Sequence, residues 1–131
     1  MISRLECAIA GQSGAVRFMP GSLSARAYGR EEASEEFRCN FGLNPKYRSA
    51  FASEPLRVAG VDANGELRVV ELANHRFFVA TLFLPQLSST PTFPHPLVLA
   101  YLRAGAAFRD ARRARPQSER PDTIMVQGED R

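Results

Sequence analysis

The feature that most constrains this chain is an uncharged apolar run at residues 77–83, Phe-Phe-Val-Ala-Thr-Leu-Phe. The run is rich in aromatic and β-branched side chains, and polar or proline-rich segments flank it. This pattern is typical of a strand that is buried on both faces of a sheet. Pro85 ends the strand, because proline cannot continue a central ladder. In an open α/β sheet, ligands bind at the carboxyl ends of strands, so we expect functional residues directly after Phe83.

The length and composition of the chain fit one globular domain. Its 131 residues are 44% hydrophobic and 9% aromatic, which suits a packed core. No apolar run reaches the roughly 18 residues that a membrane span needs, and the short apolar segment near Met1 predicts no signal peptide. Two cysteines, Cys7 and Cys39, are too few for a disulfide framework or a metal cluster. We therefore expect a cytoplasmic protein with no metal and no cofactor.

The chain has a net charge of +3, and its basic residues are most concentrated near its end. Four arginines fall within seven residues there: Arg109, Arg112, Arg113 and Arg115. Residues 1–108 mix both signs, and no RNA- or DNA-binding signature accompanies the cluster, so we expect neither nucleic acid nor a membrane as a partner. The last residues lack periodicity and carry charge and proline. The chain is thus predicted to form one domain over residues 1–114 and a disordered tail over residues 115–131.

The N-terminal part predicts two strands and a helical turn. Residues 3–10 and 15–19 are short apolar segments separated by a glycine-rich turn, which favours a hairpin. Residues 21–29 predict a helical turn that packs on the sheet. The side chains expected to make that packing are Leu23, Ala27 and Tyr28.

The next segment predicts a loop and then a half-buried strand. Residues 30–36 are charged and are predicted to form the loop. Residues 36–44 alternate between apolar and polar side chains, which is the period of a strand. Cys39 falls on the apolar face of this strand, so we expect a buried, inert thiol.

Two further elements precede the apolar run. Asn44 is expected to cap a short helix that begins at Pro45 and ends near Ser53. Residues 56–61 and 67–72 are two apolar segments around an Asn-Gly pair, the strongest short signal of a β-hairpin.

The segment after the apolar run predicts a loop and a long helix. Residues 88–96 are rich in proline and threonine, and Pro96 is expected just inside a helix that runs to about Arg109 or slightly beyond. The helix would cover the sheet. For His75 and His95 we expect structural histidines held by hydrogen bonds.

Two motifs resemble a known family. Residues 74–97 follow the pattern N-H-x-F-F-V-A, then S-T-P, then H-P-L, and residues 21–29 read G-S-L-S-A-R-A-Y-G. Both resemble the C-terminal part of the glutamine amidotransferase domain of CTP synthase, where hydrolysis of glutamine supplies ammonia for CTP synthesis. The resemblance covers residues 2–108. It implies an α/β fold, namely a partial class I glutamine amidotransferase-like fold with a mixed sheet, hairpins and flanking helices.

The family's catalytic residues are replaced at the matching positions. In the family the strand ends in His-Pro-Glu, where the histidine is the general base for a cysteine nucleophile and the glutamate orients the histidine. Here these positions hold Leu84, Pro85 and Gln86. Leucine cannot accept a proton, and an amide cannot stabilise an imidazolium as a carboxylate does. The arginine that helps to hold glutamine in the family matches Asn40. The resemblance therefore implies a strand whose catalytic pair has been removed.

The family's nucleophile lies earlier in its domain than the part that this chain matches. Cys7 is followed by Ala-Ile-Ala-Gly, but it lies on a predicted strand and lacks the tight strand-to-helix turn that projects a nucleophile into a cleft. We therefore expect no intact catalytic residue, and an enzyme that is inactive on its own.

Three functions stay open from the sequence. The first is a non-catalytic amidotransferase-like domain with a structural or partner-binding role. The second is one half of a split amidotransferase that needs an N-terminal partner carrying the nucleophile. The third is a small-molecule module that reuses the old glutamine cleft, floored by Phe83, Leu84 and Gln86. An uncovered sheet edge invites pairing, so we also expect self-association or a protein partner.

Overall fold

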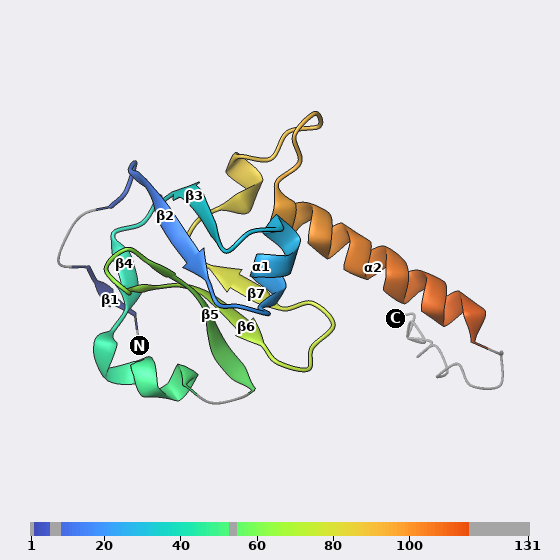
Figure 1. Ribbon diagram of the computed structural model, residues 1–131, viewed down its shortest axis with the longest axis horizontal. Helices are drawn as coiled ribbons and strands as arrows, with labels where there is room; N and C mark the ends of the chain where they lie inside the picture. Colours follow the sequence, from blue (N-terminus) through green and yellow to red (C-terminus); the bar gives the residue numbers. More distant parts are fainter. Residues whose placement is uncertain (1, 6–8, 53–54, 116–131) are drawn as a thin grey trace, which may run out of the picture.

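The computed structural model describes residues 2–5, 9–52 and 55–115 and contains two sheets and two helices (Figure 1). The larger sheet has five strands in the order β3-β2-β5-β6-β7. They are β2 Ser13–Phe18, β3 Glu32–Glu36, β5 Leu56–Asp62, β6 Leu67–Leu72 and β7 Val79–Thr81. The smaller sheet pairs β1 Ile2–Arg4 with β4 Phe41–Leu43. All strand pairs among the described residues are antiparallel.

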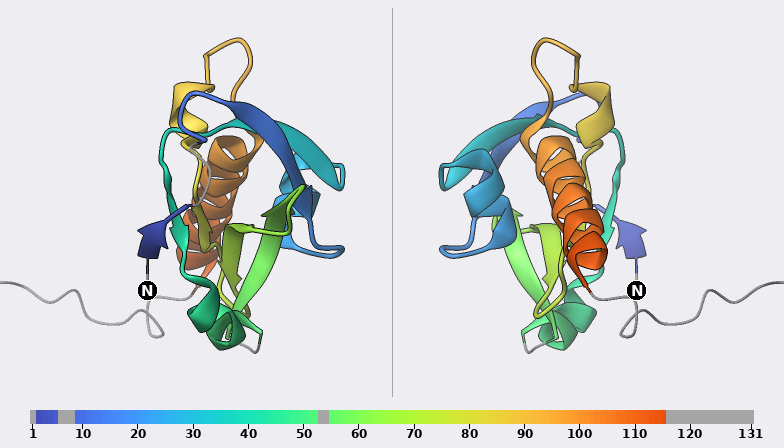
Figure 2. Two further views of the ribbon diagram at one scale, coloured as in Figure 1. Left: turned by 90° about the vertical axis from the view of Figure 1, so that its left-hand side faces the viewer. Right: turned by 90° about the vertical axis from the view of Figure 1, so that its right-hand side faces the viewer.

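Two α-helices and two 3₁₀ helices complete the structure. They are α1 Leu23–Tyr28, η1 Pro45–Phe51, η2 Pro85–Leu87 and α2 Pro96–Ala114. Helix α1 lies beside the N-terminal half of α2, and the C-terminal half of α2 projects away from the sheet (Figures 1 and 2). The predicted α/β class, with hairpins and flanking helices, is confirmed, but the sheet that was predicted to be mixed is antiparallel throughout the described residues. None of the helices in the described part of the chain has the length and apolarity that crossing a membrane requires.

The core lies between the curled five-stranded sheet and the two helices (Figure 2). Its buried side chains come from segments between β2 and the start of α2: Val16, Phe18, Ala33, Phe37, Ala59, Val69, Phe83 and Leu97. Strand β6, between β5 and β7, is deeply buried: five of its six residues are buried. Two of these five, Arg68 and Glu71, carry charge.

The β5–β6 hairpin forms where the Asn-Gly pair predicts it. Gly65 has a φ of 77°, a value that glycine adopts at little cost. The Asp62 carboxylate accepts hydrogen bonds from the backbone N–H groups of Asn64 and Glu66, both at 2.9 Å. The turn is therefore held by its own side chain as well as by glycine.

The ends of the helices also follow the predictions. Helix α1 lies within residues 21–29, with Ser22 as its N-cap. Asn44 caps η1, where its Oδ1 accepts from the N–H of Lys46. Helix α2 begins at Pro96 and runs to Ala114, which is further than expected. The predicted tail, apart from its first residue, lies outside the described residues.

The prediction for the apolar run is wrong in one respect. Only Val79–Thr81 forms a strand, β7, and it is the last strand of the sheet rather than a central one. Phe77 instead packs its ring against Tyr101 of α2, with centroids 5.6 Å apart, and Phe78 is 41% exposed. The run is apolar partly because it contacts α2, and composition does not distinguish that contact from burial between two strands.

The predicted N-terminal hairpin is also wrong. Strand β1 pairs with β4, whereas β2 pairs with β3 and β5. The segment between β1 and β2 is held by residues 37–40 instead, since Gly11 N–H donates to the carbonyl of Phe37 and Leu5 N–H to that of Asn40. These bonds join residues distant in sequence, so local turn chemistry did not predict them.

The segment at residues 30–44 divides differently from the prediction. Residues 32–36, expected in a loop, form β3, and the expected strand at 36–44 is broken between β3 and β4. Phe37 takes the core position at the break, and Cys39 is exposed rather than buried. The prediction of a buried Cys39 thiol is therefore wrong, because a bend in the chain interrupts the period of two.

Candidate functional site

The residues that match the family's catalytic pair, Leu84 and Gln86, follow shortly after the end of β7. Leu84 is 43% exposed and lines a hollow of about 20 Å³, between the ends of β3 and η2. Such a volume holds about one water molecule. Gln86 lines a different, open hollow of about 280 Å³ between β7 and α2. The structure thus places Leu84 and Gln86 in separate hollows, although only Pro85 lies between them.

Asn40, the third predicted site residue, holds the backbone of residues 9 and 10 in place. Its Oδ1 accepts hydrogen bonds from the N–H groups of Ile9 and Ala10, both at 2.8 Å. Neither hollow beside Leu84 or Gln86 includes Asn40. The three predicted positions are therefore not gathered into one cleft, and Cys7 lies outside the described residues.

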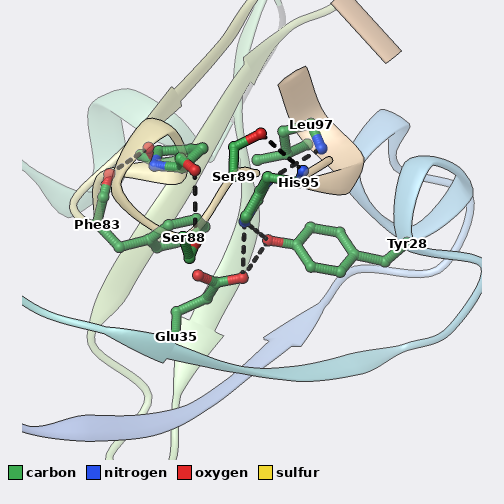
Figure 3. A network of polar contacts seen from close by, with 9 residues as sticks. Tyr28, Glu35, Phe83, Ser88, Ser89, His95 and Leu97 are labelled. Carbon is green, nitrogen blue, oxygen red and sulfur yellow. Dashed lines mark hydrogen bonds and ion pairs between the residues drawn. The ribbon is translucent and has the colours of Figure 1, made fainter. Parts of the chain in front are cut away.

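A buried polar network includes Glu35, which lines the same hollow as Leu84, and Figure 3 shows the members of the network. Glu35 of β3, Tyr28 of α1 and His95 at the start of α2 meet there. The Tyr28 hydroxyl donates to Glu35 Oε1, and His95 Nε2 lies 3.1 Å from both that oxygen and the Tyr28 hydroxyl. Burial raises the pKa of Tyr28, and its hydrogen bond to Glu35 raises it further.

The contacts of His95 define its tautomer. Nδ1 accepts a hydrogen bond from the backbone N–H of Leu97, so the ring proton lies on Nε2 and is directed at Glu35. The backbone N–H of His95 donates to Ser89 Oγ. His95 therefore caps α2 and joins it to β3 and α1, which confirms the prediction of a structural histidine. His75 is exposed, and its ring accepts a hydrogen bond from the N–H of Phe77, so the predicted hydrogen bond is present without burial of the ring.

Sequence reasoning missed Glu35 and Glu71 as structural carboxylates. Glu71 lies in β6 and is 2% exposed; it accepts hydrogen bonds from the N–H groups of Leu23 and Ser24 and from the Ser24 hydroxyl. Its charge also lies at the N-terminus of α1, where anions are favoured. A glutamate inside an apolar strand was the available signal, since such a group needs partners when buried.

Comparisons with known proteins agree with the motifs. CTP synthase of Synechococcus sp. (strain JA-2-3B'a(2-13)) is 38% identical over 113 residues, covering 86% of this chain and 20% of that protein. CTP synthase of Rhodococcus opacus (strain B4) is 46% identical over 87 residues, covering 64% of this chain and 15% of that protein. The chain thus spans a fifth or less of the length of these curated relatives. No family model matches the chain.

A solved structure shows the same fold. The glutaminase domain of Trypanosoma brucei CTPS, determined with bound acivicin, superposes with a TM-score of 0.73 at 22% identity. The match covers 81% of this chain and 46% of that one. Together, the similarity to curated relatives and the shared fold identify the chain as a class I glutamine amidotransferase-like region of the CTP synthase family.

Proposed function

We propose that this chain is a non-catalytic glutamine amidotransferase-like domain, a cytoplasmic pseudoenzyme with a structural or partner-binding role. The observation that carries the proposal is the end of β7, where Leu84 and Gln86 stand at the positions of the base and the orienting acid and line separate hollows. Its ancestral role would be the supply of ammonia to pyrimidine biosynthesis. The proposed loss of catalysis follows from the chemistry of these residues.

A proton acceptor at position 84 is essential to the family's mechanism. The base must take a proton from the thiol nucleophile, and leucine has no lone pair with which to do so. The buried His95–Glu35 pair does not replace it. Nδ1 of His95 already accepts from Leu97, and Nε2 contacts Glu35 and Tyr28. The small hollow beside Leu84 also disfavours a small-molecule module in the old glutamine cleft.

The alternative is one half of a split amidotransferase, and a trans assay distinguishes the two. The chain would be mixed with the separately expressed N-terminal half of the amidotransferase domain of the Rhodococcus opacus relative, and ammonia release from glutamine measured. We expect no release above that of either protein alone. A positive control replaces this chain with the matching C-terminal half of the same relative. Turnover that requires this chain would favour the split enzyme.

The partner of this domain is expected at the edge of the five-stranded sheet. No further strand pairs with β7 in the described part of the chain, and its residues Val79, Ala80 and Thr81 are uncharged. Exposed apolar side chains occur just before and after it at Phe78 and Leu84, and Tyr101 of α2 lines the open hollow beside it. An unpaired, uncharged edge favours association with another chain.

We predict self-association at micromolar concentrations, measured by sedimentation velocity. Ala80 is exposed on β7. Ala80→Lys should shift the chain toward monomer, because charges at a sheet edge oppose strand pairing. The matched control is Ser34→Lys, at an exposed position of the opposite edge strand β3. A native chain that stays a folded monomer throughout this range would contradict the prediction.

A further inference from the structure

The hydrogen bonds between β6 and β7 define which backbone groups of β7 face the rest of the sheet. Leu82 N–H donates to the carbonyl of Arg68 at 2.9 Å, and Leu72 N–H donates to the carbonyl of Phe78 at 3.3 Å. In an antiparallel ladder the backbone groups of successive residues alternate between the two sides of a strand. Ala80 lies midway between these two bonds, so its N–H and C=O groups also face β6.

The backbone groups of Val79 and Thr81 face the opposite way, out from the sheet. Among the described residues, β7 has no partner strand on that side. The side chains of both residues line the hollow between β7 and α2, whereas Ala80 between them is exposed. The outer edge of β7 therefore offers two N–H and two C=O groups to an added strand, next to an apolar hollow.

The two edge strands of the sheet differ in charge. Strand β3, at the opposite edge, reads Glu-Ala-Ser-Glu-Glu, so two copies paired there about Ser34 would set Glu32 opposite Glu36. Strand β7 carries no charge. The nearest charged residue in sequence is Arg76, whose guanidinium group lies over the ring of Phe108, 3.7 Å from the centroid. Because like charges on facing strands are destabilising, β7 is the edge that is compatible with pairing to a copy of itself.

Strand β7 is complementary to itself in one antiparallel register. With Ala80 of both copies on a two-fold axis, Val79 of each copy lies opposite Thr81 of the other. Each of these pairs exchanges both backbone hydrogen bonds, so every outward group of the strand is satisfied. The two Ala80 residues form the close pair between them, with Cα atoms about 4.5 Å apart, where a small side chain fits. A register centred on Val79 would instead set Thr81 opposite Phe77, which lies outside β7.

We infer that the partner at this edge is a second copy of the chain, whose β7 pairs antiparallel about Ala80 and joins the two five-stranded sheets into one. The inference rests on the proposed partner-binding role and names its partner and register. A two-fold contact of this kind closes on itself, so the expected species is a dimer. Pairing of β7 with β3 of another copy would leave free edges and give larger species instead.

Disulfide crosslinking tests the register. In a chain that also carries Cys7→Ser and Cys39→Ser, Ala80→Cys places two thiols across the two-fold axis, at a Cα separation that a disulfide accepts. We expect most of this variant to oxidise to a covalent dimer. Val79→Cys and Ser34→Cys in the same background are the matched controls. They should give at least about tenfold less dimer, because their thiols do not meet across this axis. Equal crosslinking by Ser34→Cys, or none by Ala80→Cys, would overturn the inference.

Hydrogen exchange of the native chain tests the same contact without substitutions. The amide of Ala80 faces β6 and should be protected at every concentration. The amides of Val79 and Thr81 should become protected, by about tenfold or more, only above the association midpoint found by sedimentation. Association without this protection, or species larger than a dimer, would contradict the β7 pairing and leave the partner-binding role in place. A chain that stays monomeric would contradict the pairing and the predicted self-association together. Ammonia release tests the loss of catalysis separately from all of these results.

Discussion

Replacing His95 with alanine is expected to lower the free energy of unfolding by about 3 kcal/mol. His95 is 5% exposed, and its ring contacts Glu35, Tyr28 and the backbone N–H of Leu97. Alanine would leave the buried Glu35 carboxylate with one donor fewer and the first turn of α2 without its cap. The expected loss is large because a buried, partly unpaired carboxylate cannot regain its hydration. Urea denaturation followed by circular dichroism measures the change.

His75→Ala provides the matched control. His75 is exposed, and the hydrogen bond described for its ring is accepted from the N–H of Phe77. Its loss should cost no more than about 0.5 kcal/mol, as is usual for surface positions. Equal effects of the two substitutions would mean that the network of Tyr28, Glu35 and His95 does not hold α1, β3 and α2 together.

The second large loss of stability is expected when Glu71 is replaced. Its carboxylate accepts from the N–H groups of Leu23 and Ser24 at 2.9 and 2.7 Å, and from the Ser24 hydroxyl at 2.9 Å. Glu71→Ala would leave these donors unpaired and should lower the free energy of unfolding by about 3 kcal/mol. Glu71→Gln retains an acceptor oxygen and should cost about half as much.

Hydrogen exchange locates the effect of Glu71. In Glu71→Ala the backbone amide of Ser24 should exchange faster relative to the amides of β6, because the N-terminus of α1 loses its anchor. Glu32→Ala, at an exposed position of β3, is the control and should change neither stability nor exchange at Ser24. Unchanged exchange at Ser24 in Glu71→Ala would contradict the role assigned to this carboxylate.

Local sequence signals predicted the elements whose causes are local. The hairpin turn at Gly65 depends on Asp62 and on glycine within the same turn, and the cap of η1 depends on Asn44 beside Pro45. Pairing between distant segments was not predictable in this way. Strand β1 was assigned to the wrong partner because hydrogen bonds to residues 40–43 decide its position. The apolar run was placed at the sheet centre because packing against α2 gives the same pattern.

The candidate site shows the same difference between what local sequence predicts and what contacts between distant segments decide. The family resemblance selected Leu84, Gln86 and Asn40. A resemblance matches positions in the sequence and carries no information about the contacts of each side chain. The backbone role of Asn40 depends on Ile9 and Ala10, and that of Glu35 on Tyr28 and His95. Arg68 carried no sequence signal beyond its charge in an apolar strand. Its buried ion pair with Asp62 and its position over the ring of Phe37 became evident only from the structure.

The central proposal, loss of catalysis, is tested most directly by ammonia release from glutamine. Three proteins are compared: the native chain, Leu84→His with Gln86→Glu, and that pair combined with Cys7→Ser. The double change supplies the residue types of the family's pair, an imidazole whose usual pKa is about 6.5 and a carboxylate two residues later. A base alone does not cleave glutamine through a thioester, however, and Asn40 replaces the arginine that helps to hold the substrate in the family. We predict no release by any of the three. Turnover by the native chain, or turnover in the double variant that is lost with Cys7→Ser, would contradict the proposal.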